Sequence, residues 1–170
     1  MRKRPVDQAA FEQFWQPHRS RVWRLVARLA GNLDLADDLT QEVSLRAFQG
    51  FGAFRRESAA YTWLYQIAIH VVQRHRERRT LELVPWDCAA HAPDPAPSPH
   101  AATLQTETRS LIWAALERLP DEQRTTLILS LYEELKYREI ADVLDIPLGT
   151  VKSRLHTGMA RLREELKDAL

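Results

Sequence analysis

The sequence is poor in the residues on which secreted domains and nucleotide-binding enzymes depend. Its 170 residues include a single cysteine, Cys88, and only five glycines. One cysteine excludes an intramolecular disulfide framework and fits a reducing compartment. Neither GxGxxG nor GxxxxGK[ST] occurs, so a phosphate-cradling loop and nucleotide-driven chemistry are not expected.

Long apolar runs and an excess of one charge are also missing. No stretch is long enough to span a bilayer, and the basic start Met1–Arg4 is not followed by an apolar run, so we expect no signal peptide. Lys and Arg number 24 against 23 Asp and Glu, a net charge of +1. Any affinity for nucleic acid must therefore be local. We expect a soluble protein of the cytoplasm.

Proline is concentrated in one segment, whereas the rest of the chain has a helical period. Because proline lacks an amide hydrogen and restrains its neighbour, neither a helix nor a central strand is expected there. Elsewhere apolar residues recur at three and four positions, as in Val22, Leu25, Val26 and Leu29, and no stretch alternates long enough to form a strand. We predict an all-α fold of two small helical domains, residues 1–80 and 106–170, joined by a flexible proline-rich linker over 81–105.

The most specific motif is YREIADVLDIPLGTVKSRL, from Tyr137 to Leu155. Its apolar residues have the spacing by which two steeply crossing helices bury one core. Asp145 occupies the turn position that favours glycine, and Asp tolerates a left-handed backbone. The second helix is expected to begin at Gly149 or Thr150. The pattern predicts a helix-turn-helix.

The second helix of this motif is basic. No acidic residue occurs from Gly149 through Arg163, although the rest of the domain holds many carboxylates. An acid-free helix suits the major groove, where Lys and Arg meet phosphate or guanine. The alternative is an ordinary solvated amphipathic helix. The residues expected on the outward faces of this second helix are Lys152, Ser153, Arg154, His156, Thr157, Arg161 and Arg163.

Two further surfaces lie in the N-terminal half. Trp63, His70 and Arg74 share one helical stripe, and the short loop before it carries Phe51, Phe54, Arg55 and Arg56. Aromatic rings with arginines suit unstacked bases, but these rings are equally consistent with ordinary core residues. In DDLTQEV and the residues after it, one side carries Asp38, Gln41, Glu42 and Leu45, which alone would be read as a solvated face.

These motifs together resemble bacterial sigma factors. LPDEQR (119–124) leading into the helix-turn-helix is similar to their minus-thirty-five-reading domain, region 4. ADDLTQEV followed by WLYQIAIH (63–70) is similar to region 2, which reads the minus-ten element. The small two-domain form resembles the extracytoplasmic-function group. The resemblance implies a non-catalytic subunit without a cofactor that binds core RNA polymerase, directs it to promoter DNA and helps open the duplex. It also implies an anti-sigma partner, through which the chain is held at the membrane.

The resemblance also assigns roles to individual residues. Asp38, Gln41 and Glu42 would face the polymerase. Minus-ten DNA would meet Phe54, Arg55, Arg56, Ser58, Trp63, His70, Arg74, Arg76, Arg78 and Arg79. The minus-thirty-five element would meet Thr150, Lys152, Ser153, Arg154, His156 and Thr157. The chain departs from the family at His70, where Asn is usual, at Thr157, where Arg is common, and at Glu134, where Gly often precedes the motif.

Three other functions are compatible with parts of the sequence. A stand-alone helix-turn-helix regulator would use its N-terminal helices to sense a ligand or to dimerise, but no heptad seam is present. A metal or redox switch would use Cys88, His91 and His100, which is short of the four ligands of a closed zinc site. An enzyme would need Cys88 as nucleophile, yet nothing in the linker orients a base.

Overall fold

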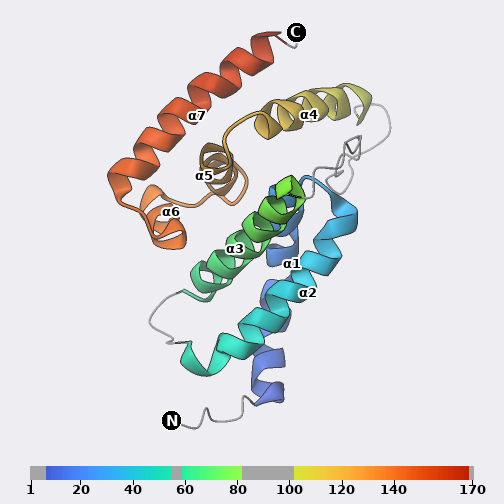
Figure 1. Ribbon diagram of the computed structural model, residues 1–170, viewed down its shortest axis with the longest axis vertical. Helices are drawn as coiled ribbons and strands as arrows, with labels where there is room; N and C mark the ends of the chain where they lie inside the picture. Colours follow the sequence, from blue (N-terminus) through green and yellow to red (C-terminus); the bar gives the residue numbers. More distant parts are fainter. Residues whose placement is uncertain (1–6, 55–58, 82–101, 169–170) are drawn as a thin grey trace. The chain divides into compact units, whose positions relative to one another are not determined.

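The computed structural model describes residues 7–54, 59–81 and 102–168, which form helices joined by short turns (Figure 1). The elements are α1 (Gln8–Ala30), α2 (Leu33–Gly50), the 3-10 turn η1 (Phe51–Ala53), α3 (Ala60–Leu81), α4 (Ala102–Glu117), α5 (Asp121–Leu131), α6 (Tyr137–Leu144) and α7 (Leu148–Asp168). The predicted all-α class is confirmed, with no strand in the described ranges. The chain divides into two compact units, Met1–Cys88 and Ala89–Leu170. Most of the predicted linker lies outside the described residues.

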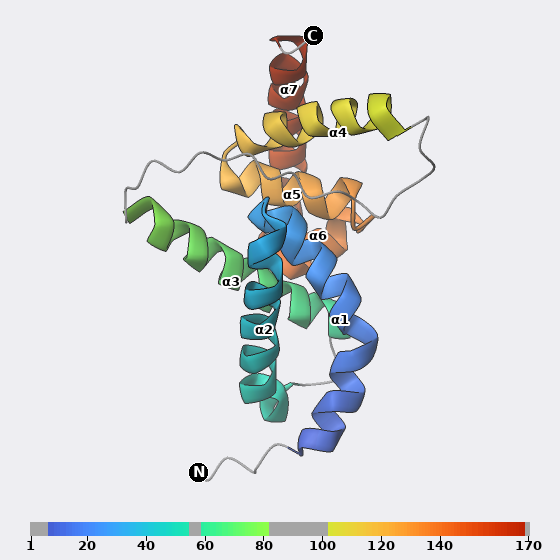
Figure 2. The ribbon, with the colours of Figure 1, turned by 90° about the vertical axis from the view of Figure 1, so that its right-hand side faces the viewer.

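Unit 1 is a three-helix bundle in which α1 and α2 run side by side and α3 lies across them (Figure 2). Asp7 caps α1 by accepting a hydrogen bond from the Ala9 amide at 3.0 Å. Gly31, with φ of 67°, ends α1, and the Asn32 side chain accepts from the Asp34 amide at 2.8 Å to begin α2. The predicted apolar stripes form the core, which includes Trp15, Val22, Leu25, Val26, Val43, Leu64, Ala68 and Val71.

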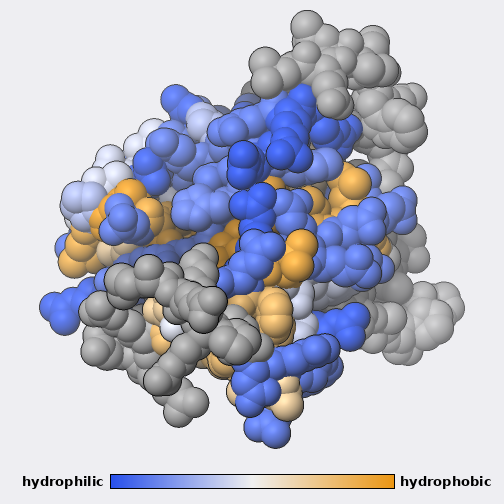
Figure 3. Space-filling model, turned by 60° about the horizontal axis from the view of Figure 1, so that its bottom comes forward, coloured by the Kyte–Doolittle hydropathy of each residue, from blue (hydrophilic) through white to orange (hydrophobic). Residues whose placement is uncertain are grey.

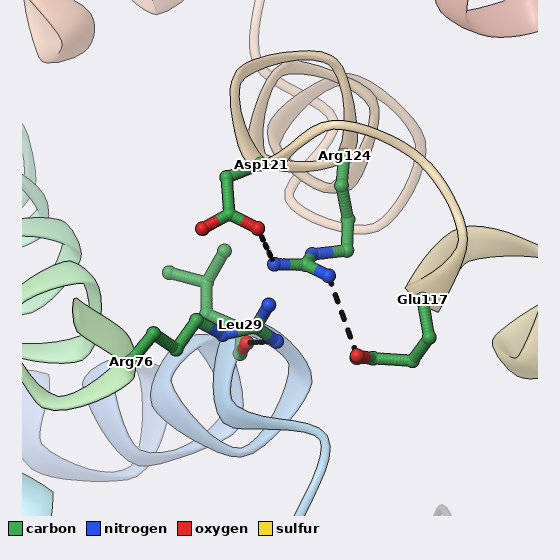
Figure 4. A network of polar contacts seen from close by, with 5 residues as sticks. All are labelled: Leu29, Arg76, Glu117, Asp121 and Arg124. Carbon is green, nitrogen blue, oxygen red and sulfur yellow. Dashed lines mark hydrogen bonds and ion pairs between the residues drawn. The ribbon is translucent and has the colours of Figure 1, made fainter. Parts of the chain in front are cut away.

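Two arginine contacts fix α3 to α1. Arg21 donates from Nε to the buried Tyr65 hydroxyl at 2.8 Å, and its guanidinium lies 5.2 Å from the Tyr61 ring centroid. Arg76 donates from Nη2 to the Leu29 carbonyl at 2.6 Å (Figure 4). The Leu29 carbonyl belongs to the last turn of α1, where carbonyls lack partners within the helix. These contacts set the position of α3 by side chains from distant parts of the sequence.

Unit 2 is built around α7, which packs against α4, α5 and α6. Val151, Leu155 and Leu162 are buried along α7, and α5 contributes Leu127, Ile128 and Leu129. Gly158 is buried where α5 and α7 meet, and a Cβ there would lie 3.1 Å from Leu127 Cδ1 and 3.4 Å from Gln123 Cβ. Glycine at this position therefore permits the close approach of the two helices.

A buried arginine ties the start of α5 to the end of α4. The Arg124 side chain is 3% exposed, pairs with Asp121, and places Nη1 3.3 Å from Glu117 Oε2 (Figure 4). A guanidinium can be buried here because carboxylates at the surface compensate its charge. The arginine of LPDEQR is thus a structural residue of unit 2.

The turns around α6 use left-handed backbone at residues other than glycine. Asp145 ends α6 with φ of 52°, which confirms the predicted conformation, and Glu134 precedes α6 with φ of 54°. A glycine at position 134, which the resemblance implies, would avoid the cost of about 1–2 kcal/mol that a left-handed backbone imposes on an ordinary residue. The predicted start of α7 at Gly149 or Thr150 is wrong. The helix begins at Leu148, because the Pro147 carbonyl already accepts from the Thr150 amide at 2.9 Å.

Large apolar side chains reach the surface at few places in the described parts of the chain. Leu45 is 58%, Leu131 50% and Tyr137 48% exposed, and Leu131 is the last residue of α5. One face of the molecule shows hydrophilic side chains with apolar ones between them (Figure 3). Within the described ranges no helix has the length and apolar character needed to cross a membrane.

Candidate nucleic-acid and protein interfaces

The outward face of α7 presents a compact set of polar and basic side chains. Lys152, Ser153, His156 and Thr157 are all exposed, and successive members of this set are one, three and one positions apart, so they share one side of the helix. The Thr157 hydroxyl donates to the Ser153 carbonyl at 2.9 Å. Buried residues occupy the opposite side, and Thr150 is half-buried in the first turn. Five of the six predicted minus-thirty-five residues thus lie on the outward face or beside the helix start.

Arg154, the sixth of these residues, points to another element. Its Nη2 lies 2.7 Å from Glu122 Oε2 in the first turn of α5. The Arg154 side chain is only 22% exposed, whereas that of Glu122 is 67% exposed. The guanidinium therefore lies at the edge between the outward face of α7 and α5, with a carboxylate already bound to it.

On α3, the predicted minus-ten residues separate into exposed and structural ones. His70, Arg74, Arg78 and Arg79 are exposed, whereas Arg76 is half-buried and donates to the Leu29 carbonyl. The geometry gives Arg76 a role in helix packing that the sequence did not indicate. Arg55, Arg56 and Ser58 lie outside the described residues.

Trp63 belongs to an aromatic cluster. Its ring stacks on Phe54 at a centroid distance of 4.7 Å and an interplanar angle of 27°, and lies 6.0 Å from Phe14. Gly50 permits this placement, since a Cβ there would lie 3.2 Å from Trp63 Cζ2. Because Trp63 and Phe54 are both half-buried, packing is one of their roles. The rings in mutual contact are Phe11, Phe14, Trp15, Phe48, Phe51, Phe54 and Trp63.

His18 lies next to this cluster, with its ring centroid 5.4 Å from that of Phe14. Burial lowers the pKa of His18, and the nearby Arg21 guanidinium lowers it further. The lowered pKa favours the neutral imidazole at this edge of unit 1.

The outward side of α2 carries the predicted polymerase residues. Asp38 and Gln41 are exposed, with Leu45 one turn further along. Glu42 is half-buried and pairs with Arg46 at 2.5 Å on the same helix. The adjacent Asp37 differs, because it accepts a hydrogen bond from Trp23 Nε1 at 2.7 Å. Both neighbouring aspartates are exposed, and Asp37 also holds the indole of Trp23 on α1.

Sequence reasoning missed Glu122, whose carboxylate lies beside a predicted DNA-contacting residue from another helix. No local pattern reports such a pair, because helix periodicity relates only neighbours within one helix. Cys88, His91 and His100 lie outside the described residues. No group of three or more potential metal ligands occurs within the described ranges.

Two family models match the chain in the order of its two units. Residues 14–82 match sigma-70 region 2, and residues 109–162 match sigma-70 region 4. The first match covers the N-terminal helices that a stand-alone regulator would use for sensing or dimerisation. Both predicted regions are therefore confirmed.

Individual proteins agree with these matches. The RNA polymerase sigma-H factor of Pseudomonas aeruginosa is 34% identical, over 96% of this chain and 88% of that protein. The extracytoplasmic-function RNA polymerase sigma factor SigW of Bacillus subtilis is 30% identical, over 95% of this chain and 91% of that protein. The fold is like that of the sigma factor RpoE solved with the anti-sigma factor NepR from Bartonella quintana. That chain is 24% identical, with a TM-score of 0.72, and the match covers 93% of this chain and 97% of that one. The chain therefore belongs to the extracytoplasmic-function sigma factors, non-catalytic subunits that direct RNA polymerase to promoters for transcription initiation.

Proposed function

We propose that this sigma factor acts through three separate surfaces, one on each of α2, α3 and α7. The α2 surface binds core RNA polymerase, the α3 surface meets minus-ten DNA, and the α7 surface meets the minus-thirty-five element. The observation that carries this proposal is the outward face of α7, where polar and basic side chains are exposed over a helix stretch without acids. Such a face suits phosphates and base edges in the major groove.

The polymerase surface consists of Asp38, Gln41 and Glu42 with Leu45 among them. Both charged side chains are acidic, so a basic surface on the polymerase is the complementary partner. The 58% exposed leucine adds apolar area that a protein partner can bury. The ion pair of Glu42 with Arg46 fixes one carboxylate before binding. This combination favours a protein partner over DNA, whose phosphates would be repelled.

The minus-ten surface consists of His70, Arg74, Arg78 and Arg79 on α3, together with the loop residues Arg55, Arg56 and Ser58. The exposed arginines supply charge for the DNA backbone. Phe54 and Trp63 stand at the edge of the aromatic cluster, where a free ring face would stack an unpaired base. Arg76 acts by holding α3 in place rather than by direct contact.

We also propose that the chain works in the cytoplasm under an anti-sigma factor, which holds it at the membrane until release. The likeness in fold to a sigma factor that was solved with such an inhibitor supports this regulation. Co-purification with the tagged chain from its own host would test it. Recovery of the core polymerase subunits alone, under all growth conditions, would contradict it.

Reconstituted transcription tests the three surfaces together. The full chain is combined with core polymerase, and the holoenzyme selects promoters from genomic DNA fragments. Gln41→Ala should lower core affinity, whereas Gln13→Ala, an exposed glutamine of α1, should not. Equal core affinity of the two variants would contradict the α2 assignment. Failure of the wild-type holoenzyme to select any fragment would contradict the proposed DNA surfaces.

A further inference from the structure

A carboxylate from α5 reaches the DNA-facing helix of unit 2. No acidic residue occurs between Asp145, in the turn before α7, and Glu164. Glu122 of α5 nevertheless places its Oε2 2.7 Å from the Arg154 guanidinium. Most of the Glu122 side chain faces solvent, at 67% exposure. A negative charge is thus held beside the surface that is proposed to approach DNA phosphates.

The backbone of both helices makes this contact possible. Gly158 lets α7 approach Gln123 and Leu127 of α5 closely, and Glu122 directly precedes Gln123. On α7, Arg154 lies at the border between the buried residues Val151 and Leu155 and the exposed ones. The ion pair therefore lies beside a close helix contact, with Arg154 the more buried of the two partners.

An arginine held in this way differs from a mobile surface cation. A guanidinium has five N–H donors in a rigid fork, and Glu122 is bound to one of its nitrogens. The remaining donors keep one orientation, which favours a partner that fits them and disfavours phosphates at arbitrary positions.

We propose that Glu122 is a positioning residue for promoter specificity, which acts by fixing Arg154. The pair lowers affinity for DNA of arbitrary sequence and raises the ratio of promoter to non-promoter binding. This inference rests on the proposed function of α7 as the minus-thirty-five surface. Arg154 contacts DNA, whereas Glu122 acts through Arg154.

Holoenzyme binding to two duplexes tests the proposal. One duplex is a promoter selected by the wild-type holoenzyme, and the other has the same length with its minus-thirty-five element scrambled. Glu122→Gln keeps the shape of the side chain but removes the charge that holds Arg154. We expect binding to the scrambled duplex to tighten about twofold to threefold, with its logarithmic salt slope steeper by about 0.9 as one more phosphate is neutralised. Promoter binding should weaken about twofold to fivefold as preorganisation is lost.

Two controls separate this effect from a general loss of negative charge. Glu164→Gln removes the same charge from an exposed position of α7, about 15 Å of helix rise beyond Arg154, and should leave the ratio unchanged. In an Arg154→Gln background, Glu122→Gln should have no further effect, because no guanidinium remains to be released.

Several results would overturn the inference. They are an unchanged salt slope in Glu122→Gln, the same shift in Glu164→Gln, or an effect that persists without Arg154. Equal weakening on both duplexes with a lower melting temperature would give Glu122 a purely structural role and would also overturn it. A wild-type holoenzyme that does not distinguish the two duplexes would instead contradict the proposed function of α7.

Discussion

The two units hold α3 and α7, the helices proposed to face DNA, by different means. In unit 1, α3 is fixed by side chains, including the Arg21 contact with Tyr65, the Arg76 contact with the Leu29 carbonyl, and the stacking of Trp63. In unit 2, the turns before and after α6 each contain a residue with a left-handed backbone, Glu134 and Asp145. These turns set the direction in which the chain enters α7. Helix α3 thus carries packing residues and proposed DNA-contacting residues side by side, whereas α7 carries them on opposite sides. Substitutions should disturb folding more in unit 1 and binding more in unit 2.

Trp63→Ala is expected to have the largest effect. It removes a half-buried ring that packs on Phe54 and Phe14, and should destabilise unit 1 by about 2–4 kcal/mol. Amide hydrogen exchange of α1 and α3 in the full chain measures this loss separately from unit 2. Exchange in unit 2 serves as the internal reference.

Trp63→Phe distinguishes packing from base stacking. A phenylalanine keeps most of the ring contacts, so we expect less than half of the alanine effect on stability. Permanganate footprinting of the promoter then reports duplex opening. Wild-type exchange in Trp63→Ala, combined with lost opening, would show that the ring serves DNA rather than the scaffold.

Lys152→Ala should act on binding and leave folding intact. Its side chain is exposed on α7, so stability should stay within about 0.5 kcal/mol. Holoenzyme affinity for the promoter should fall by about 1–3 kcal/mol for a bidentate contact to a base, and by less for a phosphate contact. Competition between promoter and scrambled duplexes measures the loss. Lys167→Ala, at the far end of α7, is the control. An equal loss of affinity in this variant would show that Lys152 contributes only general positive charge, and would contradict the idea that unit 2 separates binding from folding.

The sequence predicted those features that depend on residues close together along the chain. Periodicity predicted the buried stripes, because it reports neighbours within one helix. The turn position of Asp145 predicted its left-handed backbone, because few residues tolerate that conformation. The motif order also predicted the two sigma regions, each of which matches a family model.

Contacts between distant residues were beyond sequence reasoning. The pattern placed Arg76 with the other arginines of α3, and only the structure brings it to the Leu29 carbonyl. The same holds for Glu122 and Arg154. A glycine ordinarily weakens a helix, but packing against Leu127 makes the missing side chain of Gly158 useful. In each case the partner lies on another helix, where spacing along the chain gives no information.

Arg76→Ala and Arg78→Ala test whether two nearby arginines of α3 serve packing and DNA binding separately. Loss of the charged donor to the Leu29 carbonyl should destabilise unit 1 by about 1–2 kcal/mol. Arg78 is exposed, so its removal should leave stability nearly unchanged and weaken minus-ten binding instead. Hydrogen exchange and promoter affinity are measured on both variants. Equal stability of the two would show that the contact of Arg76 with α1 contributes nothing to the scaffold.

Glu134→Gly should give the smallest change, and it should be a gain. The residue is exposed and has φ of 54°, a conformation that costs glycine no steric energy. Glycine is more flexible in the unfolded chain, however, and therefore loses more entropy on folding. Relief of backbone strain stabilises the variant, and the added entropy loss of glycine opposes it. Because the strain is the larger of the two, we expect unit 2 to be stabilised by about 0.5–1 kcal/mol. Asp145→Gly, at nearly the same φ, should gain less, because Asp tolerates this backbone better than Glu. Thermal unfolding of both variants measures the difference. A gain at position 134 that exceeds the gain at 145 would locate the strain of unit 2 in the turn before α6, whereas a loss at 134 would mean that the glutamate side chain stabilises that turn.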